Sequence, residues 1–288
     1  MSAPPAARVA TVAALLSTLA GLPARADTSP APKPAFARVL LTAELGFLGA
    51  AYHRIQYGKS GSVFDYVDEG GQKPLAPFWR LAAELRLARR HAVIFLYQPL
   101  AFTTSVRLRR DIVVDELRYP AGTGVDLFYG FDFWRMSYLY DLFGRPGSRR
   151  ELSIGLSLQI RNAKVSFTST DGALQRSFSN IGPVPALKVR GGYLFRRGVS
   201  LAGEADFMYA PVKYLNGGKS DVEGAIFDIN LRAGYRIRPT VDVFLNLRYL
   251  GGGAKGTSPD ENTVGDGFVS NWLHFFTLSL GATWSSAE

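Results

Sequence analysis

The chain has 288 residues, of which 47% are hydrophobic and 20% are charged, and it contains no cysteine. This composition excludes a disordered chain, a disulfide framework, a cysteine-ligated metal site and thiolate catalysis. The mean hydropathy is close to zero, which is too low for a bundle of membrane-spanning helices, and the formal charge of +9 makes the placement of the basic residues important.

The first 35 residues predict two segments that precede the fold. Arg8 stands before an apolar stretch at 9–22, and the sequence ARA at 24–26 is a small-x-small cleavage site. These are the parts of a secretory signal peptide, so we expect residues 1–26 to be removed on export. Residues 27–35 are rich in proline and show no periodicity, which predicts an exported linker.

From residue 36 to residue 284 the sequence alternates between apolar and polar residues in long runs. The run 152–160 carries leucine or isoleucine at every second position, and the runs 225–237 and 241–249 behave similarly. Successive side chains of a strand point to opposite faces, so each run predicts one apolar face and one polar face. Ordinary strands have about 5–6 residues, whereas a tilted strand that crosses a bilayer needs about 9–11. The lengths therefore favour membrane strands over a soluble sandwich.

The connectors between these runs alternate in length. Tight connectors lie near Arg90, at 144–150, near Arg197 and near Pro239, and longer polar connectors lie at 53–73, 104–124, 168–182, 213–222 and 251–267. This alternation predicts an all-β fold, a ten-stranded antiparallel transmembrane β-barrel with short periplasmic turns and longer extracellular loops; eight or twelve strands are the alternatives. The sequence GFDFWRM at 130–136 changes its alternation, which predicts a β-bulge there.

The last predicted strand has an apolar residue at every second position up to a terminal aromatic residue. Phe276, Leu278, Leu280 and Trp284 form this series; Ala282 is a weak member, and a short tail at 285–288 follows. The pattern resembles that of bacterial outer-membrane β-barrel proteins and covers the region 36–284. The resemblance implies location in the bacterial outer membrane, with membrane lipids and the barrel-assembly machinery as partners. It identifies no single family, and the motifs of omptin-type proteases and of lipid A deacylases or palmitoyltransferases cannot be placed in this chain.

The polar faces carry many charges that are predicted to meet in the lumen. The basic and acidic members are equal in number: Arg80, Arg86, Arg135, Arg161, Lys188, Arg190, Arg232 and Arg248, with Glu44, Glu84, Asp141, Glu151, Glu204, Asp206, Asp228 and Asp242. A ten-stranded barrel is only slightly wider than an eight-stranded barrel, whose interior is filled by side chains. Unpaired buried charges are costly, so we expect these residues to pair and to plug the lumen.

The sequence is compatible with three functions. The first is a barrel with a largely plugged lumen and a structural or interaction role; the alternatives are a narrow selective channel for small solutes and a hydrolase of lipid or peptide at the rim. The only candidate catalytic residues are His53 and His274, at the ends of the first and last strands near the acidic residues Asp65, Asp68 and Glu69. Both histidines share the parity of the lipid-facing residues, and His91 lies at a tight turn.

Arginines gather at the predicted tight turns. They are Arg89, Arg90, Arg145, Arg149, Arg150, Arg196, Arg197, Arg236 and Arg238. Anionic lipid headgroups attract such a cluster, which accounts for the basic excess without nucleic acid. The sequence contains no set of residues that indicates a cofactor or a metal site, and we expect neither.

Overall fold

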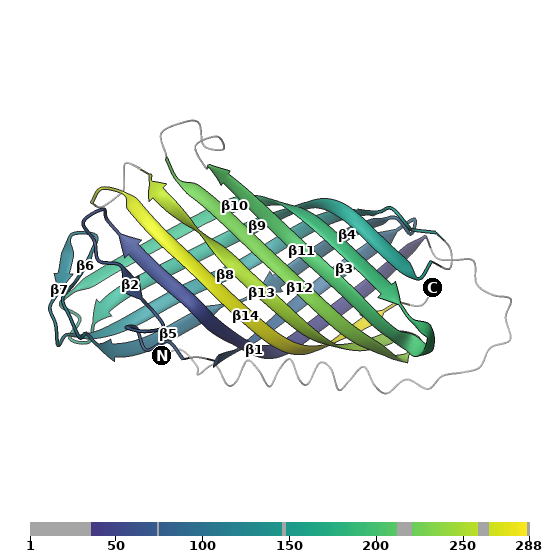
Figure 1. Cartoon of the computed structure of the whole chain (residues 1–288), viewed down its shortest axis with the longest axis horizontal. Helices are drawn as coiled ribbons and strands as arrows, with labels where there is room; N and C mark the ends of the chain where they lie inside the picture. Colours follow the sequence, from purple (N-terminus) through teal and green to yellow (C-terminus); the bar gives the residue numbers. More distant parts are fainter. Residues whose placement is uncertain (1–35, 74, 146–147, 212–220, 259–264, 287–288) are drawn as a thin grey trace, which may run out of the picture. The chain divides into compact units, whose positions relative to one another are not determined.

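The structure is a computed structural model that describes residues 36–73, 75–145, 148–211, 221–258 and 265–286. Ten long strands form a closed antiparallel barrel, which confirms the predicted fold class (Figure 1). The strands of the wall are β1 (Ala37–Tyr57), β3 (Leu75–Leu87), β4 (His91–Gln98) continued by β5 (Ala101–Arg107), β8 (Gly124–Asp141), β9 (Arg150–Ser169), β10 (Gln175–Leu194), β11 (Val199–Pro211), β12 (Glu223–Arg238), β13 (Val241–Thr257) and β14 (Phe268–Ser285).

The barrel closes through the pairing of β1 with β14. Their contact runs from Leu40↔Ser285 to Tyr57↔Val269, so β14 ends one residue beyond the predicted boundary at Trp284. The four tight turns lie where the sequence predicts them, between β3 and β4, β8 and β9, β10 and β11, and β12 and β13. The start of β1 and the end of β14 lie at this short-turn end of the barrel (Figure 1).

The loop end of the barrel differs from the prediction in detail. The connector predicted at 168–182 is wrong in length, because β9 and β10 continue to Ser169 and from Gln175 and leave only a five-residue turn, 170–174. The connector predicted at 213–222 lies mostly outside the described residues, and so does part of 251–267, after β13 has run on to Thr257. The other two connectors contain short strands, β2 (Phe64–Asp65) in the first, and β6 (Ile112–Val114) with β7 (Leu117–Tyr119) in the second.

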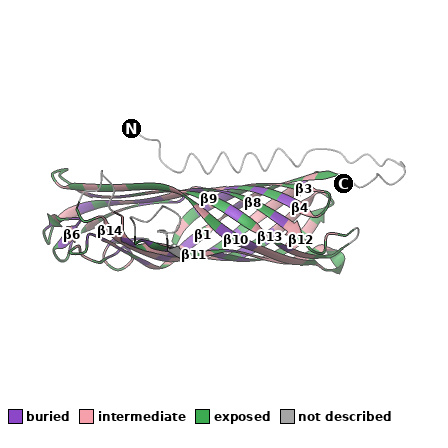
Figure 2. Ribbon diagram, turned by 90° about the horizontal axis from the view of Figure 1, so that it is seen from above, coloured by how far each residue is buried: buried purple, intermediate pink, exposed green. Residues whose placement is uncertain are grey.

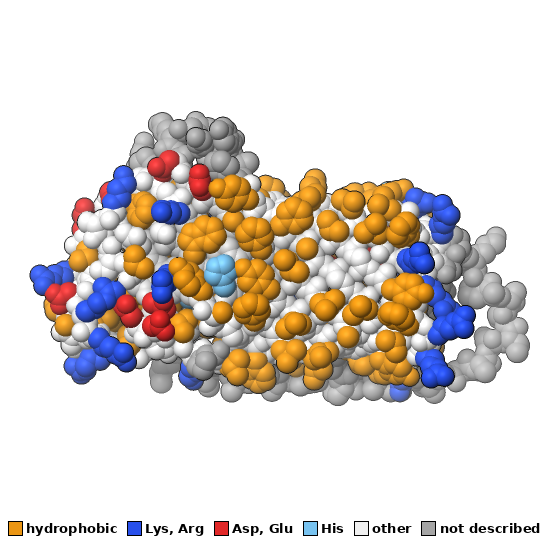
Figure 3. Space-filling model, viewed as in Figure 1, with side chains coloured by type: hydrophobic (Ala, Val, Ile, Leu, Met, Phe, Trp, Pro, Cys, Tyr) orange, Lys and Arg blue, Asp and Glu red, His pale blue; other side chains and the backbone are white. Residues whose placement is uncertain are grey.

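The side-chain pattern of the wall inverts halfway along the strands. Near the short turns the outer face is apolar and the inner face is polar: on β9, Leu156 is 66% exposed while Ser157 is buried. Nearer the loops the same strand turns Val165 and Phe167 inward, with Phe167 only 1% exposed, and leaves Lys164 outside. Figure 2 shows the alternation of burial along the strands, and Figure 3 shows the hydrophobic belt in the half nearer the short turns.

Strand length explains the inversion. A tilted strand crosses the bilayer with about 9–11 residues, whereas β9 and β10 have 20 residues each. The belt therefore faces lipid and encloses a polar interior. The outer half of the wall stands above the lipid, where polar residues face water and apolar residues pack inside, as in a soluble protein. The described residues include no helix long and apolar enough to cross a membrane.

The prediction of a β-bulge at 130–136 is wrong. The pairing of β8 with β9 runs from Val125↔Ser169 to Asp141↔Ser153 without a shift of register. The alternation changes there because Phe131 and Phe133 point into the apolar outer half of the lumen, whereas Arg135 points into its polar half. The irregular neighbour is the other strand paired with β8, which is interrupted at residues 99–100 between β4 and β5.

A real bulge lies elsewhere, in β1. The register of β1 against β14 shifts between Ala50 and Tyr52, which leaves Ala51 as the extra residue. Before this point the even-numbered residues Glu44 and Leu48 face inward, and after it the odd-numbered residues His53 and Ile55 do. One extra residue exchanges the two faces of a strand, so the outer segment of β1 has the opposite parity from the one the sequence predicts.

Candidate functional site

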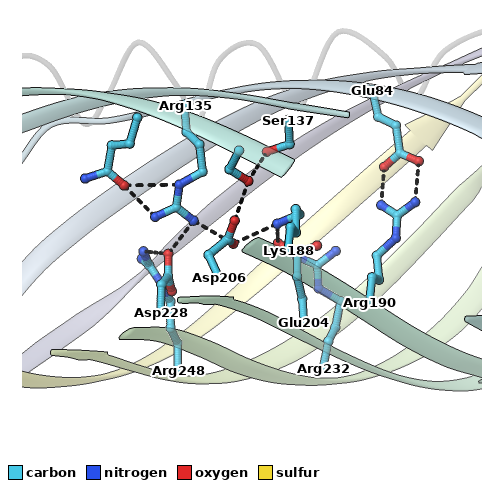
Figure 4. Close-up of polar contacts among 12 residues, drawn as sticks. Glu84, Arg135, Ser137, Lys188, Arg190, Glu204, Asp206, Asp228, Arg232 and Arg248 are labelled. Atoms are coloured by element: carbon cyan, nitrogen blue, oxygen red, sulfur yellow. Dashed lines mark hydrogen bonds and ion pairs between the residues drawn. The ribbon is translucent and has the colours of Figure 1, made fainter. Parts of the chain in front are cut away.

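The polar half of the lumen contains a central network of three bases and three acids, contributed by five strands. Its members are Arg135 of β8, Lys188 of β10, Glu204 and Asp206 of β11, Asp228 of β12 and Arg248 of β13 (Figure 4). All are inward positions of their strands, as the parity of the sequence predicts. Five of the six side chains are at most 2% exposed, so the network is almost wholly shielded from solvent.

Each charge in the central network has an opposite partner within hydrogen-bonding distance. Arg135 donates from Nη1 to Asp206 at 2.8 Å and to Asp228 at 2.7 Å. Arg248 binds Asp228 through two nitrogens, at 2.5 and 2.7 Å, and Lys188 donates to Asp206 at 2.8 Å and to Glu204 at 2.5 Å. Such charge-assisted bonds are the strong ones, and a continuous chain of them, from Arg248 to Glu204, offsets part of the desolvation cost of burying the charges.

Two smaller clusters continue the ion pairs within the same lumen. Near the short turns Arg190 makes a bidentate contact with Glu84 at 2.8 and 3.0 Å, and Glu151 binds both Arg190, at 2.5 Å, and Arg86. The other cluster is centred on Glu44, which accepts a hydrogen bond from Arg232 at 2.9 Å, while Arg80 lies 3.8 Å away. Asn246 and Ser279 complete the hydrogen bonds of this carboxylate.

Three of the residues predicted for the lumen network have other partners. Asp141 accepts backbone N–H groups of Phe143 and Leu152 and caps the β8–β9 turn. Asp242 pairs at 2.9 Å with Arg236, which the sequence places at a tight turn. Arg161 donates to Asn180 at 2.9 Å and lies beside the tyrosines of the outer half.

The network also includes uncharged residues that the sequence-based prediction omits. Gln159 accepts from Arg135 at 2.6 Å, Gln98 accepts from Arg248 at 2.5 Å, and Ser157 donates to Asp206 at 2.5 Å. The alternation of inward and outward positions along each strand would identify them, because all three residues occupy inward positions. Charge alone cannot identify them.

The outer half of the lumen is filled by an apolar core around His53. Phe64 and Tyr66 come from the β1–β3 connector and pack inside the wall with Tyr129, Phe167 and other buried residues. The expectation that His53 faces lipid is wrong: its side chain is 0% exposed, stacks on Tyr66 with 4.4 Å between ring centroids, and binds Gln72 Oε1 through Nδ1 at 2.9 Å. The bulge at Ala51 is the cause.

The structure does not bring His53 and His274 together as a catalytic pair. His274 keeps the outward parity predicted for it and lies against Tyr249, whose hydroxyl is 2.6 Å from Nδ1. The acidic residues of the rim also have other partners: Asp65 binds Arg54 at 2.7 Å, and Glu69 binds Arg110 at 2.9 Å. In the part of the chain that the structure describes, no group of three or more His, Asp or Glu residues could hold a metal ion.

A hairpin cap lies over the apolar core at the loop end. It is the β6–β7 hairpin, Ile112–Tyr119, and Ile112 and Tyr119 are 0% exposed. The cap binds β1 through the backbone of Asp115 and Tyr57, at 3.1 Å, and β9 through Tyr119 Oη and the carbonyl oxygen of Phe167, at 3.0 Å. A pair of bonds joins Val113 to Ser62. The hairpin cap is therefore bonded to two strands of the wall and to the connector that follows β1.

Comparison with known proteins supports the fold and does not identify a family. No family model matches the chain, and no curated protein sequence matches it. Among solved structures, the outer membrane protease OmpT from Escherichia coli is similar, with 14% sequence identity and a TM-score of 0.50 over 86% of this chain and 97% of that one. The outer membrane protein OprG from Pseudomonas aeruginosa has 10% identity and a TM-score of 0.36 over 88% and 97%. The chain therefore has the β-barrel fold of outer-membrane proteins.

Proposed function

We propose that this protein is a barrel of the bacterial outer membrane whose lumen is closed at rest and whose role is structural or an interaction with other components of the envelope. The observation that carries the proposal is the central network, in which Arg135, Lys188, Asp206, Asp228 and Arg248 fill the lumen at 1–2% exposure. A water-filled channel keeps its charged lining hydrated, whereas these charges bind one another.

The residues at the two ends of the wall support an orientation in which the short turns face the periplasm. The apolar belt gives lipid contact, and the short turns carry the arginines that we expect to bind anionic headgroups of the periplasmic leaflet (Figure 3). The longer connectors then face outward, away from the cell. Membrane lipids and the barrel-assembly machinery remain the partners that we propose for a barrel of this kind.

Conductance across a planar bilayer tests the proposal. We expect the purified, folded protein to give no steady ion current, and liposomes that contain it to exclude small sugars. Folding is checked first by the shift of gel mobility on heating, so that a silent sample is known to be folded. A large and stable conductance would show an open lumen and would establish the selective channel in place of the closed barrel.

A further inference from the structure

β10 is paired with β11 along only part of its length. The ladder between them starts at the short turn and ends at the pair Leu187↔Phe207. Within the described residues, the rest of β10, 175–186, pairs only with β9, and the rest of β11, 208–211, pairs only with β12. We call the boundary between these two unpaired edges the β10–β11 boundary.

Two prolines on β10 oppose an extension of this ladder. The N–H of Phe195, directly after β10, donates to the carbonyl oxygen of Val199 on the β11 side, at 2.8 Å. N–H groups alternate between the two neighbours of a strand, and β10 pairs with β9 without a shift of register, so its odd-numbered N–H groups face β11. Pro183 and Pro185 are odd-numbered and have no N–H to donate. The β10–β11 boundary is therefore specified by the sequence.

The outward side chains place the β10–β11 boundary at the level of lipid. Leu187 and Phe207, at the last pair, are apolar and exposed on the outer face. Tyr209, the next outward residue of β11, is 66% exposed, and Ile181, further along β10, is 69% exposed. Ile181 pairs with the outward polar residue Asn162 of β9. The boundary thus begins within the belt and reaches its outer margin at Ile181.

Open space lies on the inner side of β10 at the same level. Gly182 occupies an inward position next to Ile181. Apart from the adjoining residues of the chain, the nearest heavy atom to a Cβ built on Gly182 would be Asn180 Oδ1, at 4.0 Å. Asn180 is exposed, although its position is also inward. A side chain added at Gly182 would therefore enter unoccupied space.

Arg161 lies beside this space and has no acid partner among the described residues. It pairs with Gly182 across the β9–β10 ladder and donates to Asn180 Oδ1 at 2.9 Å, while its Nε is buried without a hydrogen-bond partner. Each of the other predicted lumen bases lies within ion-pair distance of a glutamate or an aspartate. An unpaired charge in a protein interior is costly, so the space beside Gly182 favours a ligand with a negative charge.

We propose that the β10–β11 boundary binds a single-chain amphiphile with a carboxylate headgroup. The headgroup lies at Arg161 in the space beside Gly182, and the acyl chain lies against the apolar outer face at Leu187 and Phe207. Gly182 faces inward and its neighbour Ile181 faces outward, so only the thickness of one strand separates the two parts of the site. The headgroup passes between two strand edges that no ladder joins.

The arrangement of charge and apolar surface selects this class of ligand. A soluble anion would not need the apolar outer face, and a neutral hydrocarbon would not need Arg161. The charge lies at the margin of the belt and the apolar contacts lie deeper, which is the distribution of groups in an amphiphile across a membrane interface. The site opens sideways to the bilayer, so it does not require an open lumen.

Photolabelling of the folded protein in nanodiscs of saturated phosphatidylcholine tests the proposal. The probe is a palmitate analogue that carries a diazirine in the middle of its chain, and the labelled peptides are identified by mass spectrometry. We expect labelling that saturates with concentration and falls on residues 181–187 and 205–209. Excess palmitate should displace the probe, whereas hexadecanol, which has the same chain without the charge, should not.

Two variants test the headgroup. Arg161→Gln should weaken the saturable labelling about tenfold, because one charge-assisted contact is lost. Gly182→Val keeps Arg161 but fills the space beside it, and it should abolish the saturable labelling; the backbone at Gly182 does not have the positive φ that favours glycine. The matched controls are Arg150→Gln, at the exposed start of β9, and Gly191→Val, at an outward position of β10 where a Cβ also has room. Both controls should label as the parent does.

Other outcomes would overturn the proposal. Unsaturated labelling spread over the belt would show partition into the bilayer alone. Saturable labelling that is unchanged in Arg161→Gln, or that hexadecanol displaces as well as palmitate does, would exclude the anionic headgroup. Unchanged labelling in Gly182→Val would exclude the inner space as the headgroup site. Heat-modifiable gel mobility confirms that each variant is folded. The conductance measurement is separate, so a failure here leaves the closed lumen untouched, and the reverse also holds.

Discussion

Arg135 joins four strands through one side chain. Its guanidinium on β8 donates to Gln159 on β9, Asp206 on β11 and Asp228 on β12. A guanidinium has five N–H donors in a fixed planar fork, so it can bind several acceptors without being deprotonated. An ammonium group is a compact point charge and cannot reproduce this geometry. Arg135 therefore balances charge and also fixes the register of opposite walls.

Replacing Arg135 should destabilise the barrel strongly. In Arg135→Ala the carboxylates of Asp206 and Asp228 remain buried with one base fewer, and breaking a buried pair in this way costs about 3–5 kcal/mol. Arg135→Lys should fall between this variant and the parent. Urea unfolding of the reconstituted protein, followed by tryptophan fluorescence, measures the free energy of unfolding.

The matched control is Arg145→Ala, at the exposed β8–β9 turn. A surface substitution of this kind normally changes the free energy of unfolding by less than about 0.5 kcal/mol. Equal unfolding midpoints and slopes for Arg135→Ala and Arg145→Ala would show that the central network does not stabilise the fold.

For single residues, the sequence predicts which side chains face the lumen but not which of them meet. Parity places Arg135 and Asp228 inside, because side chains alternate along a strand. Their contact joins residues that are 93 positions apart, and it depends on the tilt and stagger of the closed barrel, which one strand alone does not reveal. The expectation for His53 is wrong for a local reason, since the bulge at Ala51 has no clear signature in the sequence.

Among the elements, the hairpin cap is held in an unfavourable conformation by its contacts. Its two-residue turn, Asp115 and Glu116, has φ of 47° and 70°, in the left-handed region that glycine and asparagine prefer. Asp115 is buried against Tyr57, and its carboxylate is 3.9 Å from Arg176 of β10. Burial raises the pKa of the Asp115 carboxyl; Arg176 opposes this effect, whereas Glu116 and Asp266 add to it.

The raised pKa predicts a pH-dependent cap. A carboxyl whose pKa is higher in the folded state than in the unfolded state stabilises the fold while it is protonated. The contribution of Asp115 should therefore be complete below the usual Asp pKa of about 3.9 and should be lost as the pH rises through the raised value. Hydrogen exchange of the amides in 112–119, corrected for the intrinsic rate at each pH, should show less protection above this range.

Asp115→Asn is the control for the pH dependence. The amide resembles the protonated carboxyl in shape and does not titrate, so protection of the cap should become independent of pH over this range. Greater protection of the parent cap at higher pH, or an unchanged pH dependence in Asp115→Asn, would contradict the assignment.

The elements themselves are largely predictable, and the exceptions follow from the inversion of the wall. Tight turns and apolar outer faces identify the strands within the belt. Above the belt the outer residues are polar, as in Lys164 and Ser166 of β9 and Ser177 and Ser179 of β10. Polar residues next to a turn resemble a loop, and for this reason the predicted connector at 168–182 is too long.

At the scale of the whole molecule, side chains fill the lumen in two layers of different chemistry. The central network fills the half inside the belt by ion pairs, and the apolar core with its hairpin cap fills the half above by packing. The layers follow one another along the axis, so under the proposed function we expect either one alone to block the path.

If the central network and the apolar core with its cap each close the lumen, ions should cross the barrel only when both layers are opened. Replacing residues 109–121 by a short Gly-Ser turn should leave the barrel silent in a planar bilayer, because the central network remains. Adding Asp228→Ala and Arg248→Ala removes one acid and one base from the central network and keeps its remaining charges balanced, and adding Phe64→Ala and Tyr66→Ala thins the apolar core that the deletion leaves in place. This combined variant should produce steady current steps.

The charge-balanced pair alone, Asp228→Ala with Arg248→Ala, is the second control and should also remain silent. A steady current after deletion of the cap alone would show that the central network does not seal the lumen. A silent combined variant, folded by its gel mobility, would show that further residues block the path.

The polar outer half of the wall determines how far the hairpin cap stands from the membrane. About half of the 20 residues in β9 and β10 stand beyond the lipid, and at about 3.3 Å per residue and a tilt of about 40° they rise about 25 Å. Paired strands around a packed core do not bend as a linker does. The cap is thus held by a rigid section of the barrel wall. Any molecule that binds the cap does so at one fixed height above the membrane, clear of the lipid headgroups.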